Sequence, residues 1–241
     1  MKKYLIWDFD GTLGYRVGGW AGALLDLLQQ EAPTCEVTAE QLRLHLQTGF
    51  PWHTPDQLHT AITSADQWWD ALDPIFEGAY SAVGITIQRA RQMAKQVRQR
   101  YPHLDSWRLF EDTVPALARL SAQGWTHVIM SNHVPELRSI ICHLHLGKHI
   151  SWIFNSAETG YEKPHPQAFR NVLDTLDSPA AIWMVGDSMK ADIAGATSVG
   201  IPSILVRTHH PDAQHCCLEL SQALAIINTD CGKLGPKNRK A

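Results

Sequence analysis

The stretch Asp8–Leu13, DFDGTL, directly follows the apolar run Tyr4–Trp7, YLIW, near the start of the 241-residue chain. The apolar run predicts a buried β-strand, and side chains two apart on a strand point the same way. Asp8 and Asp10 should therefore face one spot just past the strand's end, where Gly11 lets the backbone turn. Two carboxylates so close repel each other unless a cation lies between them or one keeps a proton. This predicts a hard-metal site or a nucleophile beside a general acid; a solvated Asp-Gly turn is the alternative.

The sequence from residue 113 onward alternates between helical and strand patterns. Helices are predicted over residues 115–122, 135–146, 166–176 and 190–199, and strands over 125–130, 151–154, 181–185 and 203–206. Such alternation indicates a parallel sheet with helices on both faces. The first strand, residues 4–7, joins the same sheet although it lies about a hundred residues upstream. The predicted fold class is therefore α/β, with a Rossmann-like parallel core.

The segment between the first strand and this alternating region has no strand pattern from residue 16 to 101. One helix carries leucines at 24, 25, 27 and 28; a second follows Thr38, which caps it with Gln41 three residues on. Residues 68–83 predict a third helix, and the basic, polar run 89–101 a fourth. We therefore expect a core domain of residues 1–15 and 103–241, with residues 16–102 inserted as an α-helical cap domain.

Composition excludes several classes of protein. A formal net charge of −3 and a pI near 6.5 give no electrostatic case for nucleic acid or an anionic membrane. No apolar stretch approaches the roughly 20 residues of a membrane helix, and the chain enters its first strand too early for a signal peptide. Five cysteines do not make a disulfide framework for a chain of this size. We expect a soluble cytoplasmic protein, monomer or homodimer, with a frayed basic tail over Lys233–Lys240.

Polar residues follow several predicted strands at the point where each strand ends. Ser131 and Asn132 come after strand 125–130, and Asp187 comes after strand 181–185, with Asp192 further on. In an open parallel sheet, ligands bind beyond the carboxyl ends of the strands. Lys163, in the loop after strand 151–154, is expected at the same edge. Taken singly, Asp187 could cap a helix, Ser131 and Asn132 could end a strand, and Lys163 could be solvated. Together they offer oxygen ligands for Mg²⁺ and donors for an anion.

These segments resemble the four motifs of the haloacid dehalogenase superfamily, in the right order and each after a predicted strand. The motif segments are Asp8–Leu13, Ser131–Asn132, Lys163–Pro164, and Gly186–Ser188 continuing through Asp192–Ala196. The helical insertion after the first motif resembles the small helical cap of that family. The resemblance covers residues 4–206 and implies a Mg²⁺-dependent phosphatase acting on a small phosphorylated metabolite.

The resemblance also implies roles for the motif residues. Asp8 would attack phosphorus to form an aspartyl-phosphate, and Asp10 would protonate the leaving oxygen and later deprotonate water. Asp8, Asp187 and the main-chain carbonyl of Asp10 would hold Mg²⁺. Lys163 would bind phosphoryl oxygens and neutralise developing charge. The other residues expected at the phosphoryl group are Thr12, Ser131 and Asn132.

Three further residues are expected around this site. Asp192 would lie in its outer shell, orienting Lys163 or a water on the metal. Tyr15 and Arg16, nearest both the hinge and the nucleophile, are expected to contribute to substrate selection by the cap. Glycines and Pro102 near the two connections predict a cap that moves over the site, with a rigidly docked cap as the alternative.

Other interpretations of the sequence remain open. A phosphomutase shares every site residue, and a non-catalytic phospho-ligand-binding protein is a third class. A haloacid dehalogenase resembles this fold but lacks the second acid, Asp10 here, and needs no metal. The cap tryptophans Trp52, Trp68 and Trp69 favour core packing or a dimer contact over a substrate entrance. The His/Cys cluster of residues 209–217 matches no familiar zinc spacing.

Overall fold

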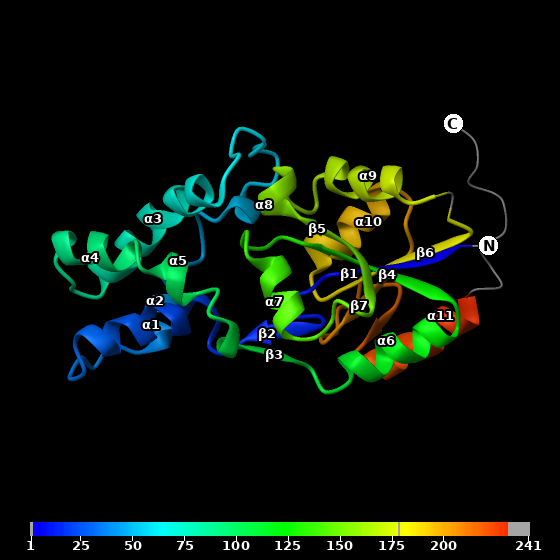
Figure 1. Cartoon of the computed structure of the whole chain (residues 1–241), viewed down its shortest axis with the longest axis horizontal. Coiled ribbons are helices and arrows are strands. Elements are labelled where there is room, and N and C mark those ends of the chain that lie inside the picture. Colours follow the sequence, from blue (N-terminus) through cyan, green and yellow to red (C-terminus); the bar gives the residue numbers. More distant parts are fainter. Residues whose placement is uncertain (1, 178, 231–241) are drawn as a thin grey trace.

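The computed structural model describes residues 2–177 and 179–230, so the basic tail Lys233–Lys240 lies outside the described residues. Its centre is a six-stranded, all-parallel sheet in the order β5-β4-β1-β6-β7-β8 (Figure 1). The strands are β1 (Lys3–Trp7), β4 (Trp125–Ser131), β5 (Ile150–Asn155), β6 (Ala181–Gly186), β7 (Ser203–Val206) and β8 (Cys216–Cys217). The predicted α/β fold is confirmed. Because β1 lies between β4 and β6, the aspartates that follow it reach the middle of the sheet edge.

Helices cover both faces of the sheet, because its central strands carry apolar side chains on both sides. Tyr4 and Ile6 pack with α9 and α10, whereas Leu5 and Trp7 pack on the opposite face with α6, α7 and α11. The core helices are α6 (Thr113–Ala122), α7 (Leu137–His143), α8 (Ser156–Thr159), α9 (Pro166–Thr175), α10 (Gly195–Ser198) and α11 (Leu220–Asp230). The predicted helix over 190–199 is instead a π-helical turn, η3 (Met189–Ala194), followed by α10.

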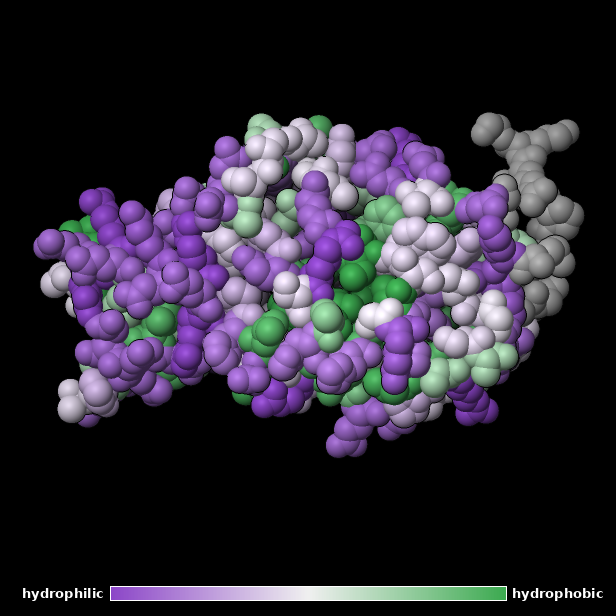
Figure 2. Space-filling model, in the orientation of Figure 1, coloured by the Kyte–Doolittle hydropathy of each residue, from purple (hydrophilic) through white to green (hydrophobic). Residues whose placement is uncertain are grey.

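The inserted segment forms a group of helices at one end of the molecule (Figure 1). Its elements are α1 (Gly19–Glu31), α2 (Ala39–Arg43), the 3₁₀ turn η1 (Pro51–His53), α3 (Ala65–Ala82), α4 (Ile87–Ala94) and α5 (Val97–Arg100). The capping box predicted for Thr38 and Gln41 is present at α2. The single helix predicted over 89–101 is wrong: α4 and α5 are separate. Figure 2 shows a largely hydrophilic outer surface at this end, so these helices turn their apolar side chains inward.

The two connections between the helical end and the core pair as a short antiparallel ribbon that the sequence did not predict. β2 (Gly14–Arg16) pairs with β3 (Trp107–Leu109), which follows the 3₁₀ turn η2 (Leu104–Ser106). Each strand has only three residues, too few for a recognisable alternation. The ribbon fastens both connections together beside the sheet edge.

Among the described residues, no helix is both long enough and apolar enough to span a bilayer.

A buried histidine links β1 to β4 in the core. The Trp7 indole N–H donates to His127 Nδ1 at 3.0 Å, so His127 Nε2 carries the proton and donates to Leu117 O at 3.0 Å. A second proton at Nδ1 would face the Trp7 donor. Burial lowers the pKa of His127 to about 4, and the ring is only 1% exposed.

We predict that His127 makes the fold acid-sensitive. Between its unfolded pKa near 6.5 and its folded pKa near 4, only the unfolded chain takes up the proton, so stability is lost as pH falls. The expected loss is about 2 kcal/mol between pH 7.5 and pH 5. Urea unfolding at both pH values measures it. His127→Gln should show a smaller loss and His45→Gln, at an exposed position, the wild-type loss; equal losses in all three proteins would contradict the assignment.

Candidate active site

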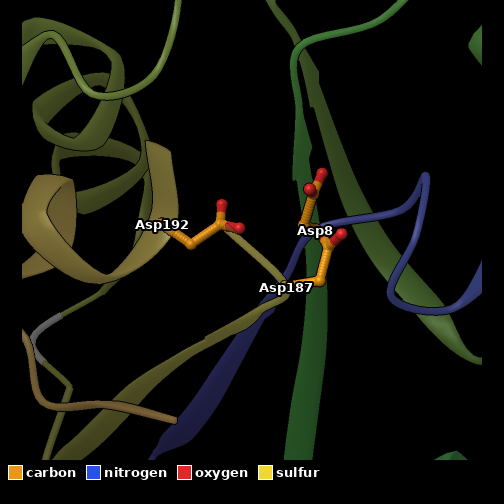
Figure 3. Close-up of side chains that lie close together, drawn as sticks. All are labelled: Asp8, Asp187 and Asp192. Carbon is orange, nitrogen blue, oxygen red and sulfur yellow. The ribbon is translucent and has the colours of Figure 1, made fainter. Parts of the chain in front are cut away.

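Three carboxylates meet at the carboxyl ends of β1 and β6. Asp8 directly follows β1, Asp187 directly follows β6, and Asp192 projects from η3. Because β1 and β6 are adjacent parallel strands, their ends lie side by side. One carboxylate oxygen from each aspartate lies within 4.8 Å of the other two, and Figure 3 shows the three groups converging. The predicted convergence of these residues is present.

The Asp8 carboxylate is held in one orientation by three donors. Its Oδ1 accepts hydrogen bonds from Ser131 Oγ at 2.7 Å and from the Phe9 N–H at 2.7 Å. Lys163 Nζ lies 2.9 Å from the same oxygen. Ser131 ends β4, the other neighbour of β1, so the sheet itself brings the donor to the acceptor. The carboxylate expected to act as the nucleophile is thus held in place by the protein's own donors.

Lys163 is a buried cation between two carboxylates. Its Nζ contacts Asp192 Oδ1 at 2.6 Å as well as Asp8, and the side chain is 2% exposed. Burial alone would lower the pKa of Lys163, but the Asp192 and Asp8 carboxylates outweigh burial and raise it. The other oxygen of Asp192 accepts from the Ser188 N–H at 3.0 Å. With both oxygens engaged, Asp192 orients Lys163 and is poorly placed to bind a metal directly.

The site carries more negative than positive charge. Burial and the neighbouring Asp8 raise the pKa of Asp10 to about 7, and burial also raises the pKa of Asp187, aided by Asp8 and Asp192. The single positive charge of Lys163 does not neutralise the negative charge of these carboxylates. A divalent cation would, and carboxylate oxygens are the ligands that Mg²⁺ prefers. The donor set of Asp8, Asp187 and the Asp10 main-chain carbonyl therefore fits Mg²⁺.

His133 adds no charge to this balance. It follows Asn132 in sequence, lies on the cavity wall and is 3% exposed. Burial lowers its pKa to about 4, so the ring is neutral near pH 7. No motif in the sequence distinguishes this histidine from the other twelve.

Thr12 and Asn132, both expected to bind the phosphoryl group, are engaged with site residues. Thr12 is fully buried, its hydroxyl donates to Asp187 Oδ1 at 3.2 Å, and it does not line the cavity. Asn132 lines the cavity, but its amide accepts from the Lys163 N–H at 2.7 Å and donates to Lys163 O at 2.9 Å. In the structure, Thr12 supports Asp187 and Asn132 fixes the main chain that carries Lys163.

Tyr15 and Arg16, expected to select substrate, lie away from the cavity wall. The Arg16 side chain is 1% exposed and donates to Tyr101 O at 3.0 Å and to two carbonyls of its own connection. Its long side chain thus turns inward and joins the two connections. Tyr15 packs on Phe110, with ring centroids 5.0 Å apart, on the outside of the ribbon.

Arg207 is a structural residue of the site that sequence reasoning missed. Its guanidinium donates twice to Thr12 O, at 3.0 and 3.2 Å, and twice to the Asp112 carboxylate, at 2.6 and 2.9 Å. Its backbone has a φ of 66°, uncommon for a residue other than glycine. Arg207 therefore ties the end of β7 to the loop that carries Asp8 and Asp10. No local sequence pattern indicates this contact.

A cavity of about 670 Å³ opens above these carboxylates. The core contributes Asp8, Asp10, Ser131, Asn132, Lys163 and Asp187, and the inserted helices contribute Trp20, Gln47, Thr48, Trp52, His53 and Tyr101. Of the three tryptophans singled out in the sequence, Trp68 and Trp69 are buried in the helical packing and Trp52 lines the cavity. In the His/Cys segment, His209 Nδ1 lies 3.1 Å from Cys216 Sγ, but no third metal-ligating side chain joins them within the described ranges.

Curated relatives of the chain include a phosphatase. A phosphoserine phosphatase from Thermus thermophilus is 30% identical over 148 residues, which cover 58% of this chain and 57% of that protein. The matched region spans about three fifths of the length of the curated relatives compared.

Solved structures share the whole fold. A 2-haloacid dehalogenase from Pseudomonas syringae has a TM-score of 0.63 at 23% identity, covering 95% of this chain and 99% of that one. The HAD-hydrolase YfnB from Bacillus subtilis, whose magnesium-bound crystal form reveals interdomain movement, has a TM-score of 0.69 at 18% identity, covering 94% and 99%. At these identities the likeness shows the fold alone.

A family model supplies the classification. The model of the hydrolase family described as haloacid dehalogenase-like hydrolase matches residues 2–200, most of the chain. The matched range contains all four motif segments, from Asp8 to Ala196, and the inserted helices. The chain belongs to the haloacid dehalogenase-like hydrolases.

Proposed function

We propose that the chain is a Mg²⁺-dependent phosphatase that hydrolyses a small phosphorylated metabolite through an aspartyl-phosphate on Asp8. The observation that carries the proposal is the Asp8 carboxylate, held by Ser131 and Lys163 beside Asp187. A phosphate monoester brings negative charge to a nucleophile that is itself an anion, so cationic compensation is required. The phosphatase among the curated relatives supports the same reaction class.

Asp8 performs the first displacement. One of its oxygens forms a bond to phosphorus while the bond from phosphorus to the ester oxygen breaks, which divides one difficult hydrolysis into two steps. The donors already fixed on Asp8 keep it from rotating during the attack. Lys163 and Ser131, adjacent to the attacking group, donate to the phosphoryl oxygens as negative charge develops.

Asp10 carries the proton. Burial and Asp8 raise its pKa to about 7, so a proton is available near neutral pH for the leaving oxygen. In the second step, Asp10 takes a proton from the water that attacks the aspartyl-phosphate, and Asp8 departs as a carboxylate with release of inorganic phosphate. Asp10 thus ends the cycle protonated, as it began.

Asp8, Asp187 and the main-chain carbonyl of Asp10 would hold Mg²⁺. When bound, the ion supplies positive charge that screens the nucleophile from the phosphoryl group. Asp187 is supported in this role by the Thr12 hydroxyl. Dehalogenation of a haloacid, the reaction named for one structural neighbour, is the weaker candidate because Asp10 and Asp187 would have no task in it.

We also propose that residues 16–102 act as a cap that closes the cavity over the substrate. Beyond the connecting ribbon, hydrogen bonds join cap and core: the His59 N–H donates to Gly160 O at 2.9 Å, and the Trp69 indole donates to Glu136 Oε1 at 3.0 Å. Closure would exclude water during the attack by Asp8, and opening would admit it.

Asp8→Asn should abolish hydrolysis of p-nitrophenyl phosphate, because the amide has no anion to attack phosphorus. EDTA should abolish the wild-type rate and added Mg²⁺ should restore it. Asp174→Asn, an exposed carboxylate on α9, is the control and should keep the wild-type rate. Turnover that survives EDTA, or an active Asp8→Asn protein, would refute the mechanism.

Asp10→Asn should lower kcat by roughly 10²- to 10⁴-fold while Mg²⁺ affinity stays unchanged, because the main-chain carbonyl survives the substitution. In the wild type, the rate for alkyl phosphates should decline as pH rises and Asp10 loses its proton; in Asp10→Asn this decline should vanish. Steady-state kinetics and calorimetric Mg²⁺ titration measure the two effects, with the exposed Asp56→Asn as control. Parallel losses of rate and metal affinity would argue against a proton-carrying role.

Gly186→Ala should displace Asp192. A Cβ at this position would lie 2.2 Å from Asp192 Cγ and Oδ2, so the contact between Asp192 and Lys163 cannot persist. We expect at least a tenfold loss of kcat and about 1–3 kcal/mol of lost stability. Gly78→Ala is the matched control: its Cβ would meet open space on α3, so stability should rise by up to ~1 kcal/mol at unchanged kcat. Wild-type kinetics in Gly186→Ala would show that the Asp192 contact is dispensable.

A further inference from the structure

The cavity is far larger than a phosphoryl group requires. Its volume of about 670 Å³ falls in the range of roughly 300–1,000 Å³ found for pockets that enclose whole small molecules. The catalytic carboxylates and Lys163 occupy the core side. The part of the wall that the inserted segment contributes therefore faces the part of the substrate that leaves.

That wall is aromatic. Trp20 stacks on Tyr101 with ring centroids 3.5 Å apart and an interplanar angle of 11°. Trp52 stacks on Phe50 at 4.7 Å and 13°, and the two indoles lie 6.3 Å apart. Tyr101 and Phe50 are each 2% exposed, whereas Trp20 and Trp52 are half-buried. Trp52 is therefore backed by the buried ring of Phe50, whereas Trp20 stacks on Tyr101 and also on Phe76, whose ring centroid lies 5.5 Å away at 24°.

Aromatic side chains that neighbouring rings hold in one orientation make an effective binding surface for another ring. The stacked partners restrict Trp20 and Trp52, so little conformational entropy remains to be lost when a ligand packs on them. Polar groups border the aromatic wall: Gln47, Thr48 and Lys190 also line the cavity. An apolar wall with a polar border suits a flat ring whose edge carries hydrogen-bonding atoms.

We propose that the leaving group of the substrate carries a flat aromatic ring, of the nucleobase or aryl class, that packs against Trp52, which the neighbouring Trp20 helps to hold in place. The inference rests on the proposed phosphatase function, because it assigns the phosphoryl end of the substrate to the Asp8 side of the cavity. A sugar phosphate without a ring would leave the Trp52 indole uncovered.

Matched phosphate esters with and without the ring test the proposal. One pair is adenosine 5′-monophosphate and ribose 5-phosphate; the other is benzyl phosphate and ethyl phosphate. The wild type should prefer the ring-bearing member of at least one pair in kcat/KM, and which pair responds distinguishes a nucleobase from a simple aryl group. Ribulose 1,5-bisphosphate represents a substrate with a second anion in place of the ring.

Substitution of Trp52 tests whether this indole causes the preference for the ring-bearing ester. Trp52→Ala should lower kcat/KM for the ring-bearing ester by about 5- to 100-fold, the range expected for one stacked base. The ring-free partner should change less than twofold, and Trp52→Phe should retain most of the preference. Trp152→Ala, at a partly exposed tryptophan on β5 outside the cavity, is the matched control and should behave as wild type.

The outcomes separate this inference from the proposed function. Equal kcat/KM within both pairs, equal losses in Trp52→Ala for both members, or a preference for the bisphosphate would overturn the ring proposal while leaving the phosphatase intact. If none of these esters, nor acetyl phosphate, is hydrolysed, the phosphatase proposal fails. Calorimetry then decides the ring proposal alone: adenosine 5′-monophosphate must bind more tightly than ribose 5-phosphate, and Trp52→Ala must remove the difference.

Discussion

The concentration of carboxylates at the ends of β1 and β6 is the constraint on which the rest of the site depends. Asp8, Asp187 and Asp192 converge there, with Asp10 on the wall of the same cavity and Lys163 as the buried cation. Repulsion among them would push the strand ends apart unless each group were held. The structure holds them with Ser131, Thr12 and the Ser188 N–H. The remaining negative charge creates the affinity for a cation that the proposed chemistry requires.

Much of the fold could be predicted because its signals are local. Strands such as β1 and β6 are short apolar runs that end in polar residues, and the order of strands and helices defines a parallel sheet. The ribbon of β2 and β3 could not be predicted, because three-residue strands form only when the two connections are already adjacent. The break between α4 and α5 likewise lacks a proline or glycine to mark it.

The site shows the same division between local and long-range information. Asp8, Ser131 and Asp187 could be placed together from sequence because each ends a strand of one sheet. Arg207 acts from 195 positions away on the Thr12 carbonyl, a contact that exists only in the folded chain. Arg16 was expected at the cavity because it is near Asp8 in sequence. Its long side chain instead points away from the cavity and donates to main-chain carbonyls.

The buried Arg16 guanidinium also limits how the molecule can be rebuilt. It donates to carbonyls beside both connections, to Gly19 O at the start of α1 and to Tyr101 O directly after α5. The inserted segment is therefore not a freely exchangeable module between two independent tethers. A chimaera that takes this segment from a relative must carry both junctions and position 16 as one unit, because a junction separated from its guanidinium would leave buried carbonyls without donors.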